Sequence, residues 1–321
     1  MLKAVLLFLL GLVLLIKGGD WFVDSAVNVA HRFHIPELII GATIVSIGTT
    51  LPEVMVSATS AVSGHGEIAY GNAVGSVICN TALIAALTAA ISPQPIDRGS
   101  FRVPVVFFFL AAAFYCAVAY ISGSFSRLIG ILLVLMFIAY MAFTIYNGKK
   151  STRPPAEEEE DAPASNLVKD ILLLIVGAAC IAFGANLLVD NGTIIAEALG
   201  VPEAVIALTF VALGTSLPEL VTAVTSLIKG HGALSLGNIA GANLFNLVLV
   251  SGVSAALSPF DVPVSRTIAG VNASLLVDMP VMLLVMMLLT LPTLKKGRIY
   301  RWQGITLLCI YAAFCVFQFV V

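Results

Sequence analysis

Gly48-Thr49-Thr50-Leu51-Pro52-Glu53 is a polar hexapeptide that contains a proline and a carboxylate and lies between two apolar runs. The pattern returns 166 residues later as Gly214-Thr215-Ser216-Leu217-Pro218-Glu219. An ungapped alignment of residues 35–53 with 201–219 gives ten identities in nineteen positions. Apolar composition alone does not produce that agreement, so the chain is an internal duplication that kept this polar segment in both copies.

The duplication extends well beyond the hexapeptide. Gly71-Asn72 recurs as Gly237-Asn238 at the same offset, and Asn80 recurs as Asn246. Near the N-terminus, three residues match their counterparts in the sixth apolar segment: Gly18 with Gly184, Val23 with Val189, and Asp24 with Asp190. The first apolar segment is therefore expected to be an integral helix and not a cleaved signal peptide.

Composition places the chain among membrane proteins. Of its 321 residues, 60% are hydrophobic and 11% are charged, and the mean hydropathy is +1.05. A helix needs about 20 apolar residues to cross the hydrocarbon core of a bilayer. The sequence predicts an all-α integral membrane protein with ten such helices, at about 3–30, 37–63, 67–92, 102–122, 125–147, 167–196, 202–229, 233–257, 279–294 and 301–320.

The ten segments divide into two halves joined by a polar linker. We expect a first five-helix repeat over residues 1–147, a linker over 148–166 and a second five-helix repeat over 167–321. The linker contains three prolines and the acidic run Glu157-Glu158-Glu159-Glu160-Asp161, a composition typical of a solvated, disordered segment.

The distribution of Lys and Arg predicts the orientation in the membrane. Three of these residues lie on the N-terminal side and twelve on the other. The positive-inside rule then places both termini outside the cell and the acidic linker in the cytoplasm. Because five crossings is an odd number, the second repeat enters the membrane from the opposite face. Inverted repeats with paired helix interruptions are typical of secondary transporters, whose site lies near the midplane.

The hexapeptide supplies ligands for a cation. Pro52 and Pro218 lack an N–H group, so the helices are expected to be broken near Gly48 and Gly214, leaving carbonyl oxygens free. Thr49, Thr50, Thr215 and Ser216 add hydroxyl groups. Glu53 and Glu219 are costly inside a membrane, and no embedded basic residue stands out to pair with them. Two such carboxylates call for a cation.

A second polar stripe follows each motif. The cysteines and histidines of the chain are not expected to belong to it. Asn72, Ser76 and Asn80 are spaced by four and share a helical face, and Asn238 and Asn246 repeat the pattern. The amides could alternatively serve only to pack helices together. The five cysteines lie in apolar segments and are interpreted as small apolar fillers, and His65 and His231 as interfacial residues. Ligation by oxygen alone suits Ca²⁺ better than Zn²⁺ or Cu.

With these motifs the whole sequence resembles the calcium/cation antiporter superfamily, specifically the prokaryotic sodium/calcium exchangers. Each G-T-[ST]-L-P-E is followed by G-N-x-x-G-[SA]-x-x-x-N, as in that family's paired repeats. The resemblance implies exchange of Na⁺ for Ca²⁺ across the plasma membrane by alternating access, with the first and sixth helices sliding across a rigid core. It implies no cofactor and no enzymatic activity, and it leaves protein partners unspecified.

The resemblance also implies a set of cation ligands. They fall on Thr49, Thr50, Glu53, Ser76 and Asn80 in the first repeat, on Thr215, Ser216, Glu219 and Asn246 in the second, and on carbonyl oxygens near Ser46 and Ala212. Two positions depart from the family pattern, because Ala242 replaces a hydroxyl and Asn246 replaces an Asp found in some members.

The same comparison bears on the coupling ion and on rival functions. Asn246 weighs against K⁺ cotransport, and Gly75 and Gly241 weigh against H⁺ coupling, since proton-coupled relatives tend to carry Glu there. Na⁺ is thus favoured, and Ca²⁺/H⁺ exchange is the alternative. A cation channel is a further alternative that counter-ion-driven uphill flux would exclude. A hydrolase using Thr215 or Ser216 as nucleophile is disfavoured, because no His or Lys base lies nearby in sequence.

Overall fold

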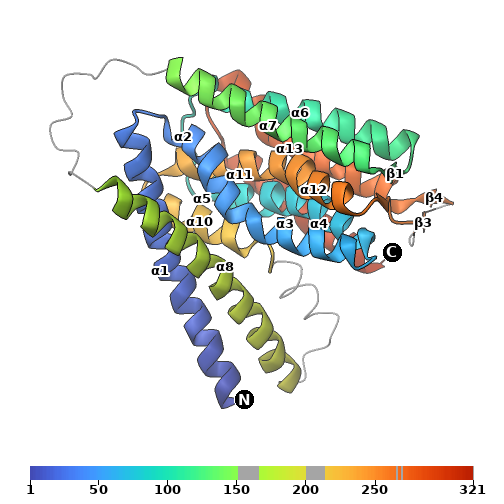
Figure 1. The fold of residues 1–321 in the computed structure, drawn as a ribbon, viewed down its shortest axis with the longest axis horizontal. Coiled ribbons are helices and arrows are strands. Elements are labelled where there is room, and N and C mark those ends of the chain that lie inside the picture. Colours follow the sequence, from blue (N-terminus) through green and yellow to red (C-terminus); the bar gives the residue numbers. More distant parts are fainter. Residues whose placement is uncertain (151–165, 200–213, 265–266, 269, 321) are drawn as a thin grey trace.

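The computed structural model describes residues 1–150, 166–199, 214–264, 267–268 and 270–320. These residues are almost entirely helical, as the sequence predicts (Figure 1). Eight helical segments within them are long and apolar enough to cross a membrane. The other two predicted crossings correspond to α10 (Leu217–Ile228) and α14 (Arg301–Val320). Residues 151–165 of the predicted linker and 202–213 of the predicted helix 202–229 lie outside the described residues. The first three residues of the predicted linker, 148–150, are helical.

The remaining elements follow the predicted segments closely. The first repeat contains α1 (Leu2–Arg32), α2 (Glu37–Ile40), η1 (Gly41–Val45), α3 (Ser46–Val62), α4 (Gly66–Cys79), η2 (Asn80–Ala85), α5 (Ala86–Ile91), α6 (Arg98–Ile121) and α7 (Arg127–Lys150). The second contains α8 (Leu167–Ala198), α10, α11 (Gly232–Phe245), η4 (Asn246–Val250), α12 (Ser251–Leu257), η5 (Ser274–Asp278), α13 (Met279–Lys296) and α14. The elements marked η are π-helical turns.

Two short antiparallel strand pairings were not predicted. β1 (Ser124–Phe125) pairs antiparallel with β2 (Phe260–Asp261), and β3 (Thr267–Ile268) pairs antiparallel with β4 (Val271–Asn272). Each strand has two residues, which is too short to leave an alternating pattern in the sequence. The first pairing ties a loop of one repeat to a loop of the other.

Element boundaries reproduce the duplication. α1 ends at Arg32 and α8 ends at Ala198, which are equivalent positions at the offset of 166 residues. α4 and α11 begin and end at equivalent residues, and the π-helical segments η2 and η4 then begin at Asn80 and Asn246. Two copies of one sequence have therefore folded in the same way.

The two copies run in opposite directions. A Cβ atom added at Gly11 would lie 2.8 Å from the carbonyl oxygen of Gly184, and one added at Gly18 would lie 2.9 Å from that of Gly177. α1 and α8 therefore approach closely and run antiparallel, as Figure 1 shows for the blue and olive helices. Gly11 and Gly18 are the repeat equivalents of Gly177 and Gly184, so a pseudo-two-fold axis relates the contacts. The predicted inverted arrangement is confirmed.

The helix interruptions take two different forms. At the first motif the structure differs from the expected break near Gly48, because α3 is continuous and contains Pro52. The irregularity lies earlier, in η1, where Tyr140 donates a hydrogen bond of 2.8 Å to the carbonyl oxygen of Ala42. At the second motif, Gly214 to Ser216 form a turn before α10, and Pro218 lies in the first turn of that helix. Proline is tolerated there because that N–H would have no helical partner.

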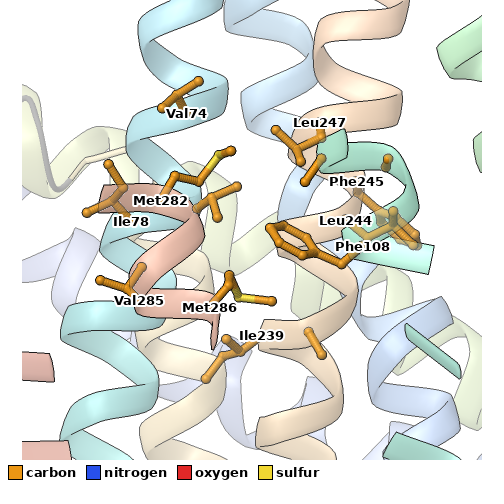
Figure 2. Close-up of a cluster of buried hydrophobic side chains, with 14 of the residues drawn as sticks. Val74, Ile78, Phe108, Ile239, Leu244, Phe245, Leu247, Met282, Val285 and Met286 are labelled. Carbon is orange, nitrogen blue, oxygen red and sulfur yellow. The ribbon is translucent and has the colours of Figure 1, made fainter. Parts of the chain in front are cut away.

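The buried apolar side chains form two hydrophobic clusters. The larger cluster joins α4, α6, α11 and α13, and Figure 2 shows Met282, Val285 and Met286 of α13 lying near side chains of α4 and α11. The smaller cluster joins α1 and α8 with parts of α2, η1 and α11, and includes Phe22, Ile181 and Leu234. The α1–α8 pair therefore packs through this second cluster against elements that also contribute to the larger one.

Candidate cation site

Glu53 on α3 and Glu219 on α10 lie close together inside the protein. Both side chains are fully buried, and their carboxyl groups interact electrostatically. Thr50, three residues before Glu53, donates a hydrogen bond of 3.4 Å to Glu219 Oε1. The two copies of the motif therefore meet at the interface between the repeats. This convergence assembles one site from two halves.

Many polar atoms in this region are buried without a hydrogen-bond partner among the described residues. They include six oxygen atoms that could accept: both carboxylate oxygens of Glu53, Oε2 of Glu219, Oδ1 of Asn80, Oδ1 of Asn246 and Oγ of Ser216. Buried polar atoms in proteins are normally paired, so such a group needs an explanation. Each of the six is an oxygen with a free lone pair, so each could serve as a cation ligand.

Asn80 and Asn246 are the first residues of the two π-helical segments. η2, which starts at Asn80, packs against α10, and η4, which starts at Asn246, packs against α3. Each amide is thus carried to the motif helix of the opposite repeat. Isolated π-helical turns are frequent at functional sites, because the extra residue changes the direction of a side chain. The sequence identified both residues but gave no sign of the π-helical turns.

A second pair of asparagines holds the motif threonines in place. Thr49 donates to Asn238 Oδ1 at 3.2 Å, and Thr215 donates to Asn72 Oδ1 at 3.2 Å. These bonds are equivalent by the repeat, and each crosses from one repeat to the other. Ser76 also donates to Asn72 Oδ1, at 3.4 Å. From the sequence, both asparagines were placed in the polar stripe but not among the ligands. Their occurrence at equivalent positions in both repeats could have identified them as part of the site.

Asn72 and Ser46 connect the site to the backbone around it. Asn72 donates to Ser57 Oγ at 2.9 Å and to the carbonyl oxygen of Glu53 at 3.4 Å. The hydroxyl of Ser46 is within hydrogen-bond distance of the carbonyl oxygens of Gly41 and Asn238, at 2.8 and 2.9 Å. The carbonyl oxygens around η1 are therefore largely satisfied by side chains. Thr49 Oγ1 also lies 3.5 Å from the carbonyl oxygen of Ser46, the first residue of α3.

Three further positions were named from the sequence. Ala212 lies outside the described residues. Ala242 is fully buried on α11 and has no hydroxyl to offer. His231 lies just before α11, and its Nδ1 is 2.9 Å from Glu37 Oε1, so it contacts that carboxylate.

Asp24, which the sequence left without a role, forms an ion pair at the end of α10. Lys229 Nζ lies 2.8 Å from Asp24 Oδ1 and 3.2 Å from Asp20 Oδ1. The three residues join α1 to α10. The repeat does not reproduce them, because Ser63 occupies the position equivalent to Lys229 and Asn186 the position equivalent to Asp20.

The family model described as sodium/calcium exchanger protein matches residues 3–146 and 169–320. Sodium/calcium exchanger MaX1 of Methanosarcina acetivorans is 31% identical over 98% of this chain and 98% of its own length. An uncharacterised membrane protein of Methanocaldococcus jannaschii, MJ0091, is 37% identical over 95% of this chain and 94% of its own.

A solved structure of the sodium-calcium exchanger NCX_Mj, soaked with Na⁺ and Sr²⁺, agrees in fold. It superposes with a TM-score of 0.81 at 35% identity and covers 97% of both chains. Sequence, structure and the inverted repeats agree along nearly the whole chain. The chain belongs to the sodium/calcium exchanger family, and it is a multi-pass membrane antiporter and not an enzyme.

Proposed function

We propose that this protein exchanges Ca²⁺ for Na⁺ at a single shared site built around Glu53 and Glu219. The observation that carries the proposal is the pair of fully buried carboxyl groups. Among the described residues, none of the salt bridges reaches either of them. Buried ions without a counter-charge cost several kcal/mol each. Two ionised carboxylates balance the charge of one Ca²⁺ and leave the site neutral.

The donor set fits the proposed cargo. Ca²⁺ takes 6–8 oxygen ligands in flexible geometry, and the site offers six unpartnered buried oxygens on five residues. Four hydroxyl groups donate hydrogen bonds to other oxygens of this group, and they belong to Thr49, Thr50, Ser76 and Thr215. If these hydroxyls rotated away, the oxygens that accept from them would also be free to bind a cation. With the carbonyl oxygens at Ser46 and Ala212, these groups are the proposed ligands of Ca²⁺ and, in turn, of Na⁺.

Competition for the two carboxylates would couple the two fluxes. Na⁺ ions and Ca²⁺ both need negative charge here, and a site that holds one excludes the other by mass action. The inverted repeats supply two related conformations, one open to each side of the membrane. We assign the motion to the α1–α8 pair, which packs against α2, η1 and α11 through the smaller hydrophobic cluster.

The proposal includes a position in the cell. The distribution of Lys and Arg in the sequence supports a plasma-membrane orientation with both termini outside and residues 148–166 in the cytoplasm.

Transport into proteoliposomes tests the proposal. Vesicles loaded with Na⁺ and diluted into K⁺ medium should accumulate external radioactive Ca²⁺ above its equilibrium level, whereas vesicles loaded with K⁺ should not. Ca²⁺ uptake driven by a pH gradient alone would assign the chain to Ca²⁺/H⁺ exchange. Flux that only dissipates the Ca²⁺ gradient would indicate a channel.

A further inference from the structure

Six cationic side chains gather at two loops, and at the helix ends beside them, that the exchange site does not use. The loops connect α5 with α6 and α13 with α14. The residues are Arg98 and Arg102 near the start of α6, Lys295 and Lys296 at the end of α13, Arg298 in the second loop and Arg301 at the start of α14. All six are exposed. None takes part in the salt bridges found among the described residues. Asp97, the nearest acid in sequence, caps α6 by accepting hydrogen bonds from Ser100 N and Ser100 Oγ at 2.9 and 2.6 Å.

Hydrogen bonds hold the two loops together as one surface. Ile96 N donates to the carbonyl oxygen of Gly297 at 2.9 Å, and Ile299 N donates to that of Gln94 at 3.0 Å. Gly297 ends α13 in the left-handed conformation, with φ of 66°, and a Cβ atom there would lie 2.6 Å from Arg98 Nε. The arginine therefore lies directly against the loop of the other helix pair.

A buried glutamine on α14 holds together the helical hairpin formed by α13, the loop 297–300 and α14. The side chain of Gln303 is fully buried. It donates to the carbonyl oxygens of Leu288 and Leu289 at 2.9 and 3.0 Å, and accepts from Tyr300 N at 2.9 Å. The cations are thus presented by a scaffold that is ordered before any ligand arrives, which lowers the entropic cost of binding.

A cavity of about 400 Å³ lies at this hairpin. Its lining is almost entirely apolar and is formed by Leu291, Pro292, Tyr300, Trp302 and the side chains of Lys295 and Lys296, both of which are exposed. The helical segment Ser274–Lys296 is apolar enough to span a membrane, so its last lysines lie at the level of the lipid headgroups. Trp and Tyr also favour that level, because their rings are apolar with a polar edge.

From these observations we infer that the cavity, called here the basic hairpin cavity, binds the phosphate of an anionic phospholipid. The two lysines would contact the phosphate, and Leu291, Pro292 and Trp302 would contact the glycerol and the first part of an acyl chain. Basic pockets at the ends of transmembrane helices are suited to such headgroups. A free phosphate ion would use the lysines but gain nothing from the apolar wall.

Thermal unfolding of the purified, full-length protein in detergent tests the inference. Added phosphatidylglycerol should raise the melting temperature of the natural sequence, whereas phosphatidylcholine and inorganic phosphate at the same concentration should not. Each basic residue near an anionic surface is worth about 1 kcal/mol, about fivefold in affinity, so K295Q/K296Q should weaken phosphatidylglycerol binding roughly thirty-fold. Trp302→Ala should also weaken it.

The matched control is K3Q/K169Q, which removes two exposed lysines elsewhere on the surface and should leave the lipid response unchanged. Equal stabilisation by phosphatidylcholine, or by inorganic phosphate, would overturn the assignment of an anionic lipid. So would a K295Q/K296Q variant that responds to phosphatidylglycerol as the control does. Native mass spectrometry provides a second measurement, since the natural sequence should retain more phosphatidylglycerol than K295Q/K296Q.

Discussion

Replacing Glu53 with Gln removes one of two adjacent buried charges without changing the size of the side chain. Glu53 is fully buried, and neither of its carboxylate oxygens has a hydrogen-bond partner among the described residues. Two unit charges 4 Å apart interact by about 4 kcal/mol at an effective dielectric constant of 20. A divalent ion at that distance would lose about 8 kcal/mol and a monovalent ion about 4 kcal/mol.

The substitution should therefore change selectivity as well as affinity. The difference of about 4 kcal/mol corresponds to about a thousandfold loss of Ca²⁺ affinity relative to Na⁺. Na⁺-driven Ca²⁺ uptake into proteoliposomes should fall to background. In buffer without Na⁺ or Ca²⁺, the variant should unfold at a higher temperature than the natural sequence, because it buries one carboxyl group fewer without a counter-charge.

Glu67→Gln is the matched control, because Glu67 is an exposed carboxylate at the start of α4. It should transport Ca²⁺ normally and keep the increase in melting temperature that Ca²⁺ produces. The reasoning fails if Glu53→Gln still accumulates Ca²⁺ against its gradient, or if Ca²⁺ stabilises that variant as strongly as it stabilises the control.

Three further substitutions probe other parts of the structure. Asn246→Asp adds a carboxylate where both side-chain amide atoms are buried and unpartnered. Because the added negative charge attracts Ca²⁺, the Ca²⁺ concentration at half-maximal uptake should fall. Because the charge is buried, the ion-free protein should melt at a lower temperature. Asn238→Leu removes the amide oxygen that accepts from the Thr49 hydroxyl. The protein should lose about 1–3 kcal/mol of stability in denaturant titrations, and Ca²⁺ uptake should weaken. Unchanged uptake would show that Asn238 does not contribute to the site. Lys229→Met breaks a half-exposed ion pair, so stability should change by less than about 1 kcal/mol, while the ratio of Ca²⁺ uptake to Ca²⁺ release in oriented vesicles should shift.

The sequence predicted the parts of this protein that the duplication repeats. The offset of 166 residues identified Glu53 and Glu219 as equivalent, and the structure brings the two motifs together, with Thr50 donating a hydrogen bond to Glu219. The segments near Asn80 and Asn246 were identified by the same argument. In each case the information is local, because a polar residue inside an apolar run stands out by itself.

What the sequence did not predict depends on which residues meet across the repeats. Asn72 and Asn238 were visible as polar residues, but their partners Thr215 and Thr49 belong to the opposite repeat. Pro52 predicted a break, yet α3 continues through it, because losing one backbone hydrogen bond does not end a helix whose neighbours pack around it. Asp24 has no evident role in the sequence alone, because its ion-pair partner Lys229 lies 205 residues away along the chain.

That ion pair makes the two halves unequal. A protein made of two identical inverted copies would spend equal time exposed to each side of the membrane, since a two-fold rotation would relate its two orientations. Lys229 with Asp20 and Asp24 links α1 to α10, whereas Ser63 and Asn186 at the equivalent positions cannot form such an ion pair. If the exchanger alternates access as proposed, we expect this ion pair to bias the side that the ion-free protein faces, and substitutions there would change the bias without any change at Glu53 or Glu219.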